Sequence, residues 1–87
     1  MSRLIFAEKA WEEYVFWQEN DRRTLKRINL LLKDIIRNGN EGIGKPEPLK
    51  HLDGWSRRID NVHRLVYQLN GDLIEILQCK GHYTDKP

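Results

Sequence analysis

Apolar residues recur along this chain at two spacings, which predict one short strand, two helices and then three strands. The run Leu4-Ile5-Phe6 is typical of a first strand. A helix is predicted from Glu8 to about Glu19, where apolar and aromatic side chains return at helical spacing at Ala10, Trp11, Tyr14 and Val15. The pattern restarts at Asn20-Asp21 and continues to residue 37, through Leu25, Ile28, Leu32, Ile35 and Ile36, before the stop signal Asn38-Gly39. Two amphipathic helices that meet at Asn20 predict an αα-hairpin.

The second half of the chain predicts a meander of strands. Residues 55–59 and 63–69 are typical of strands joined at Asp60-Asn61, and Asn70-Gly71 is a strong hairpin signal. A two-residue turn at Asn70-Gly71 would pair Tyr67 with Ile74 and Leu65 with Ile76, which places these four apolar side chains on one face, under the helices.

The turn at residues 60–61 decides which arginine lies across from Arg64. A two-residue turn would place Arg57 there, and a slip of one residue would place Arg58 there instead. Two adjacent guanidinium groups repel each other unless an anion lies between them.

The element order β-α-α-β-β-β predicts an α+β fold. We expect one domain over residues 1–87, built from an antiparallel four-stranded sheet with the N-terminal αα-hairpin packed on one face. The opposite face would carry charged side chains and would suit RNA.

The connector between the second helix and the meander is rich in residues that restrict or redirect the backbone. Residues 39–54 hold four of the six glycines and two of the three prolines. Pro46 and Pro48 flank Glu47, and each proline has a fixed φ and pushes its predecessor toward an extended conformation. A stiff loop of this kind can hold one carboxylate in place, although a plain connector is the simpler interpretation.

The composition shows an excess of basic residues in the middle of the chain and indicates the cellular compartment. The net charge of the 87 residues is only +2, but residues 22–64 hold eleven Lys and Arg against five acids, which suits a polyanion or an acidic protein partner. The single cysteine, Cys79, cannot form an internal disulfide, which favours a reducing compartment. With no apolar stretch long enough for a bilayer and no signal-peptide pattern, we expect a soluble cytoplasmic protein with no membrane contact.

Several short motifs stand in a distinctive order along the chain: Trp11 with Tyr14 and Trp17, residues 44–50 (GKPEPLK), 55–59 (WSRRI), 63–67 (HRLVY) and His82-Tyr83. Taken together, they resemble the YoeB toxins of the RelE/ParE superfamily. The resemblance implies a ribosome-dependent mRNA endonuclease that acts in the ribosomal A site. It also implies a homodimer, a cognate YefM/Phd-type antitoxin, and contact with operator DNA only through the antitoxin complex.

The resemblance also implies a set of site residues for cleavage without metal or cofactor. Glu47 would take the proton of the RNA 2′-hydroxyl, Arg64 would clamp the phosphate, and His82 would protonate the departing 5′-oxygen. The products would carry a 2′,3′-cyclic phosphate and a 5′-hydroxyl. Further contacts to RNA or phosphate are predicted for Lys45, Lys50, Arg57, Arg58 and Tyr83. Gly81 departs from the family pattern, in which an aromatic residue often precedes the histidine.

Other functions remain open from the sequence. A ParE-like inhibitor of DNA gyrase could use the same scaffold without Glu47 and His82, and so could a non-catalytic module that binds only an acidic antitoxin. Taken singly, Glu47 and His82 are typical of solvated surface residues. Cys79 and His82, with His51 and His63, lack the paired spacing of structural zinc sites.

Overall fold

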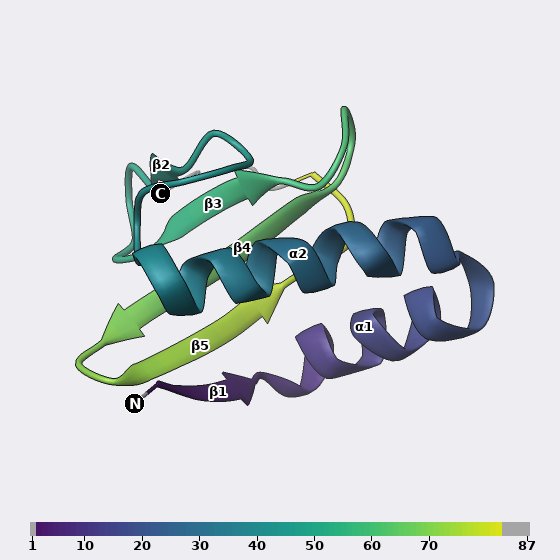
Figure 1. Ribbon diagram of the computed structural model, residues 1–87, viewed down its shortest axis with the longest axis horizontal. Helices are drawn as coiled ribbons and strands as arrows, with labels where there is room; N and C mark the ends of the chain where they lie inside the picture. Colours follow the sequence, from purple (N-terminus) through teal and green to yellow (C-terminus); the bar gives the residue numbers. More distant parts are fainter. Residues whose placement is uncertain (1, 83–87) are drawn as a thin grey trace.

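Two helices cover one face of a five-stranded sheet in the computed structural model of the chain (Figure 1), which describes residues 2–82. The elements follow one another as β1 (Arg3–Phe6), α1 (Glu8–Asn20), α2 (Arg22–Asn38), β2 (Glu47–Pro48), β3 (Trp55–Arg58), β4 (Arg64–Asn70) and β5 (Leu73–Gln78). In space the strands lie in the order β1-β5-β4-β3-β2. None of the helices within residues 2–82 has the length and apolar character needed to cross a membrane.

The predicted α+β fold with a helical hairpin on one face is confirmed, but the sheet is neither four-stranded nor wholly antiparallel. β1 pairs with β5 in parallel, because the helical hairpin separates the first strand from the meander and lets both strands run the same way. A fifth strand, β2, forms where the sequence predicted only a loop, and it pairs antiparallel with β3. This short edge strand brings the proline-flanked glutamate onto the sheet.

The two helices begin and end as their terminal residues dictate. Asp21 is the N-cap of α2, and its carboxylate accepts hydrogen bonds from the backbone N–H groups of Arg23 and Thr24. These bonds, first of all the one from Thr24, lower the pKa of Asp21. Gly39 ends α2 with a φ of 66°, a conformation that glycine adopts without strain. Ala7 gives α1 no side-chain cap.

The core lies between the helices and the inner face of the sheet. Leu65, Tyr67, Ile74 and Ile76 are all buried there, as the alternation predicted. On α1 the buried aromatic is Trp17, at 6% exposure, whereas Trp11 is 51% exposed and packs at the edge against Phe6 and Tyr14. The helical spacing therefore located the helix correctly, but Trp11, which it placed on the apolar side, is largely exposed.

Both hairpin registers differ from the predicted ones. The β4–β5 turn falls at Gly71-Asp72, so Tyr67 pairs with Ile76. This shift of two residues keeps Tyr67, Ile74 and Ile76 on their predicted face, and a bulge between Val66 and Tyr67 shifts the register by one more residue, so that Val66 pairs with Gln78. The β3–β4 turn has one residue more than predicted, because Ile59 N–H bonds to His63 O at 3.0 Å and pairs those two residues beyond the strand ends.

Candidate active site

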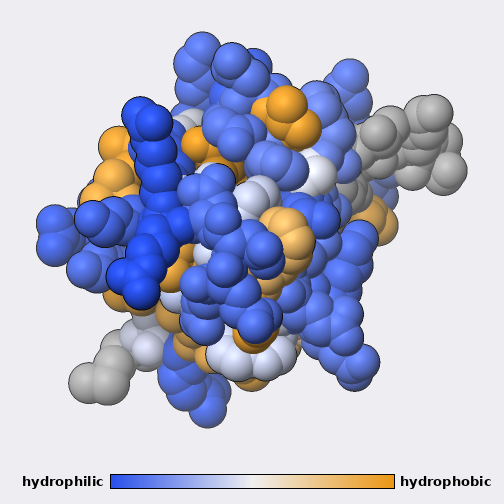
Figure 2. Space-filling view, turned by 90° about the vertical axis from the view of Figure 1, so that its right-hand side faces the viewer, coloured by the Kyte–Doolittle hydropathy of each residue, from blue (hydrophilic) through white to orange (hydrophobic). Residues whose placement is uncertain are grey.

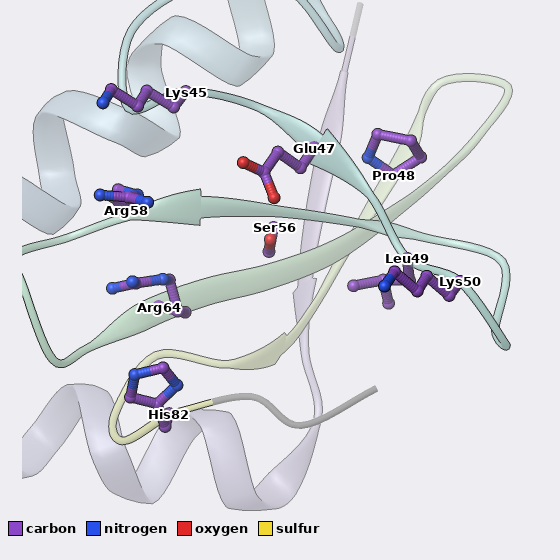
Figure 3. A pocket seen from close by; sticks show the side chains of 9 residues that line it. All are labelled: Lys45, Glu47, Pro48, Leu49, Lys50, Ser56, Arg58, Arg64 and His82. Carbon is purple, nitrogen blue, oxygen red and sulfur yellow. The ribbon is translucent and has the colours of Figure 1, made fainter. Parts of the chain in front are cut away.

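A cavity of about 250 Å³ opens on the sheet beside β2, β3 and β4, where the C-terminal segment returns after β5 (Figure 3). Its lining comes from four separate parts of the chain: Lys45, Glu47, Pro48, Leu49, Lys50, Ser56, Arg58, Arg64 and His82. The three residues expected to act on RNA, Glu47, Arg64 and His82, therefore line one cavity. They meet only in the folded chain, since 35 residues of sequence separate the first from the last.

Glu47 reaches the cavity from the edge strand β2. Its backbone pairs with Ser56 of β3, and Figure 3 shows its carboxylate directed over that serine. The Glu47 side chain is exposed. Pro46 and Pro48 hold the backbone on either side of it in a narrow range of φ. The carboxylate is thus open to a ligand while its backbone is fixed.

The backbone just before β2 is held in an unusual conformation. Lys45 has a φ of 51°, the left-handed region that costs a residue with a Cβ about 1–3 kcal/mol. The neighbouring Gly44 carbonyl accepts a hydrogen bond of 2.7 Å from the Arg58 N–H, which ties this turn to β3. The turn directs the chain from the loop after α2 back along the edge of the sheet.

Arg58 and Arg64 form a cross-strand pair of like charges. They lie opposite each other on β3 and β4, and Figure 3 shows the two side chains side by side between Glu47 and His82. Within residues 2–82 neither guanidinium has a carboxylate within the 4.0 Å of an ion pair; the ion pairs there are Arg3–Asp72 and Arg57–Asp34. Like charges directly opposite each other on a sheet are destabilising, so this pair attracts an anion.

The β3–β4 turn sets the position of the Arg64 guanidinium. Asp60 Oδ1 accepts hydrogen bonds from Val62 N–H at 2.8 Å and His63 N–H at 2.6 Å, which fixes the turn. Burial of Asp60 opposes ionisation, but the bonds from His63 and Val62 outweigh it and the pKa of Asp60 is lowered. The backbone carbonyls of Asp60 and His63 then accept hydrogen bonds from Arg64 Nη1, at 2.8 and 3.1 Å.

Arg57 does not line the cavity, and the prediction that it contacts phosphate is corrected. The extra residue in the turn places Arg57 across from Leu65, so its side chain enters the core and is 0% exposed. There it forms a salt bridge with Asp34 of α2 and donates a 3.1 Å hydrogen bond to the Tyr67 hydroxyl. Its other donors bond to the carbonyls of Gly39, Glu41 and Ile43, in the loop that leads to β2.

The remaining predicted residues divide by position. Lys45 and Lys50 line the cavity, with Lys50 on the far side of Pro48 from Lys45 (Figure 3). Tyr83 lies outside the described residues. Ser56 lines the cavity floor between Glu47 and Arg64 but was not singled out beforehand. The alternation of β3 could have found it, because Ser56 lies two residues from Arg58 and therefore on the same face.

Cys79 belongs to the core. Its thiol is buried, lies 3.5 Å from the Ala10 carbonyl oxygen, and has a pKa raised to about 12 by burial and by the charge of Glu13. Within residues 2–82 no group of three or more His, Cys, Asp or Glu side chains is placed to hold a metal ion.

Comparison with known proteins identifies the family. The sequence model of a family described as "YoeB-like toxin of bacterial type II toxin-antitoxin system" matches residues 6–83. The chain belongs to this family of YoeB-like toxins. It is 53% identical over 83 residues to Toxin YoeB of Escherichia coli strain K12, an alignment that covers 93% of this chain and 99% of that protein.

Solved structures agree over almost the whole of this YoeB-like toxin. The YoeB chain in the heterotetrameric YoeB–YefM complex from Staphylococcus aureus is 48% identical, with a TM-score of 0.88 and coverage of 95% of this chain and 99% of that one. The YoeB dimer from the same organism is also 48% identical, with a TM-score of 0.89 and coverage of 94% and 98%.

The cavity of this YoeB-like toxin brings together groups for three kinds of chemistry. It offers a carboxylate that can accept a proton, guanidinium groups that can bind an anion by paired N–H donors, and an imidazole that can give or take a proton. The carboxylate and the imidazole lie on opposite sides of the arginine pair (Figure 3).

Proposed function

We propose that this toxin is a ribosome-dependent endonuclease that cleaves mRNA in the ribosomal A site and so arrests translation in the cytoplasm. The observation that carries the proposal is the cavity in which Glu47 and His82 lie on opposite sides of Arg58 and Arg64, two arginines that have no ion-pair partner among residues 2–82. A phosphodiester bound at the arginine pair would have a proton acceptor on one side and a proton donor on the other. RNA brings its own nucleophile, the 2′-hydroxyl.

In the proposed reaction the Glu47 carboxylate removes the proton from the 2′-hydroxyl, and the 2′-oxygen attacks the neighbouring phosphorus. The bond from phosphorus to the 5′-oxygen breaks as His82 gives that oxygen a proton. Arg64, with Arg58 beside it, binds the phosphate oxygens whose negative charge grows in the transition state. The products are a 2′,3′-cyclic phosphate and a 5′-hydroxyl, and no step requires a metal or a cofactor.

The surface around the cavity supports a polyanionic substrate. A second depression, of about 390 Å³, lies at the end of β3 and is lined in part by Arg23 and Arg27 of α2. Arg27 also donates a 3.3 Å hydrogen bond to the Arg58 carbonyl, which links this depression to the arginine pair. Figure 2 shows that the end of the molecule at the α1–α2 and β3–β4 turns is mostly hydrophilic, with small separate hydrophobic patches. Such a surface does not favour lipid or an apolar protein partner.

The partners follow from the solved relatives. The staphylococcal proteins are described as a YoeB dimer and as a YoeB–YefM heterotetramer. We infer that this toxin also forms a homodimer and binds a cognate antitoxin of the YefM/Phd type, through which alone it would reach operator DNA. An antitoxin that covers the cavity would neutralise Arg58 and Arg64 with carboxylates.

The proposal is tested by removing the two proton-transfer groups one at a time. Glu47→Gln and His82→Ala should each slow cleavage of ribosome-bound mRNA by about 100-fold or more, because a positioned acid or base contributes about 10²–10⁴ in rate. Glu19→Gln, at an exposed position on α1 away from the cavity, serves as the matched control and should cleave normally. Thermal unfolding and antitoxin binding should be unchanged in all three variants.

Mapping the 5′ ends of cellular mRNA after induction separates the alternatives. Cuts at a fixed codon phase that carry 5′-hydroxyl ends support the proposed activity. DNA damage without such cuts would instead favour a gyrase inhibitor, and neither effect would favour a module that only binds antitoxin. Full toxicity in both Glu47→Gln and His82→Ala would reject the catalytic assignment.

A further inference from the structure

The segment that carries His82 is attached to the sheet through a side chain that the proposed reaction does not use, His63. After β5 ends at Gln78 the chain turns through Gly81, whose φ is 87°. The Gly81 N–H donates a 2.7 Å hydrogen bond to His63 Nδ1, and the Gly81 carbonyl accepts one of 3.1 Å from the Arg64 N–H. His82 follows directly.

The bond to Gly81 determines the tautomer of a neutral His63. A backbone N–H can only donate, so Nδ1 must be the bare nitrogen of the ring, and a neutral His63 carries its proton on Nε2. The ring is half-buried, and the indole of Trp17 packs against it edge to face at 4.9 Å between centroids. Trp17 Nε1 donates in turn to the Cys79 carbonyl at 2.9 Å, so this indole holds both the ring and the start of the segment.

The same residue also holds the phosphate clamp. The His63 carbonyl accepts a hydrogen bond from the Arg64 guanidinium at 3.1 Å, while its N–H is tied to Asp60 at 2.6 Å. His63 is therefore bonded both to the residue before the proposed acid and to the proposed clamp. Its side chain meets the segment that carries His82, and its backbone meets the side chain of Arg64.

We propose that His63 is a positioning residue for the acid step of this toxin: its Nδ1 accepts the Gly81 N–H and thereby places His82 beside the phosphate held by Arg64. The inference rests on the proposed function, because it needs His82 to donate the proton to the leaving oxygen. In that step the bond from phosphorus to the 5′-oxygen breaks and the proton passes from His82 to that oxygen. The rate of catalysis falls by roughly 100-fold when a proton donor is displaced by about 1 Å.

The first test removes the acceptor of the Gly81 N–H and then restores it. His63→Leu keeps an apolar contact with Trp17 but leaves the Gly81 N–H without its partner, and cleavage should slow by about 100-fold. His63→Asn keeps an acceptor, because Oδ1 of asparagine is bonded to Cγ as Nδ1 of histidine is, and it should recover most of that loss. Antitoxin binding and thermal unfolding of both variants establish that the chain remains folded.

The second test asks whether the defect lies in the acid step. The substrate is a synthetic mRNA bound to ribosomes, with the 5′-oxygen of the scissile linkage replaced by sulfur. A thiolate leaves without needing a proton, so His82→Ala should cleave the sulfur substrate nearly as fast as the parent does. If His63 acts through His82, the defect of His63→Leu shrinks on this substrate as well. Glu47→Gln should stay slow on both substrates, because the 2′-hydroxyl must still lose its proton.

The outcomes distinguish the two hypotheses. If His82→Ala is not rescued by sulfur, the assignment of His82 as the acid is wrong and the proposed function must be revised. If sulfur rescues His82→Ala but not His63→Leu, the proposed function stands and the role of His63 is refuted. Equal rates for His63→Leu and the parent on the ordinary substrate would refute that role directly.

Discussion

The buried arginine on β3 offers the sharpest test of how this fold is held together. Arg57→Met removes the guanidinium but keeps an apolar side chain of similar length. In the parent chain all five N–H donors of Arg57 have partners: Asp34, the Tyr67 hydroxyl and three loop carbonyls. The substitution leaves the Asp34 carboxylate and the three carbonyls without their donor, although Asp34 is partly exposed and Glu41 and Ile43 are exposed, so water can replace part of the lost bonding.

The expected loss follows from burial. Arg57 is 0% exposed, but the side chain of its partner Asp34 is 17% exposed, so we expect a loss of about 1–3 kcal/mol, the cost of leaving hydrogen-bonding groups without a partner. An 87-residue domain has a free energy of unfolding of about 4–13 kcal/mol in all, so the loss is a large fraction of the stability. For a domain of this size it corresponds to a fall in melting temperature of about 4–24 °C.

The assay is thermal and urea unfolding of the toxin without antitoxin, followed by circular dichroism. The control is Arg58→Met, the same substitution one residue along the chain but on the exposed face of β3. It should change stability by no more than about 0.5 kcal/mol. It should weaken binding to ribosome-bound mRNA, whereas Arg57→Met acts chiefly on folding. A loss below about 1 kcal/mol for Arg57→Met would refute the reasoning.

Three further predictions follow from the same region and from the core. The pKa of Asp34 is lowered below its ordinary value of 3.8, chiefly by the hydrogen bond from Arg57. The ionised Asp34 carboxylate therefore contributes to stability above pH 3.8, and this contribution is lost as the pH falls through the lowered pKa. Melting temperatures between pH 2 and 5 should therefore depend on pH less steeply in Asp34→Asn than in the parent. Gly42→Ala should destabilise the fold more than Gly71→Ala, since a Cβ at Gly42 would overlap Asp34 Oδ2 whereas Gly71 has open space; similar urea midpoints for the two would contradict this. The Cys79 thiol, with its pKa raised to about 12 by burial, should react with iodoacetamide at pH 8 only after unfolding, and rapid labelling of the native protein would show that it is accessible.

Local sequence signals located most of the elements. Helical spacing, its restart at Asn20-Asp21 and the Asn38-Gly39 stop located both helices nearly to the residue, because these signals act within one turn. The pairing of strands was harder to predict. β2 has only two residues and no strand pattern of its own, and it exists because Glu47 and Pro48 pair with Ser56 and Trp55 of β3.

The register of the β3–β4 hairpin decided which arginine reaches the cavity. Arg57 and Arg58 are indistinguishable by residue type, and both turn lengths were compatible with the sequence. The Asp60 carboxylate binds the N–H groups of Val62 and His63 and stabilises the longer turn, which places Arg58 opposite Arg64. Arg57 is then directed into the core, where Asp34 of α2 compensates its charge.

By itself the sequence determined the residue types of the site and the stiff loop around Glu47, since both depend on neighbours in the chain. Only the tertiary structure decided that Glu47, Arg64 and His82 line one cavity, that Arg57 lies inside, and that His63 holds the segment before His82. The physical reason is that these arrangements depend on hydrogen bonds between residues 10 to 23 positions apart, and on strand register, which periodicity in the sequence does not specify.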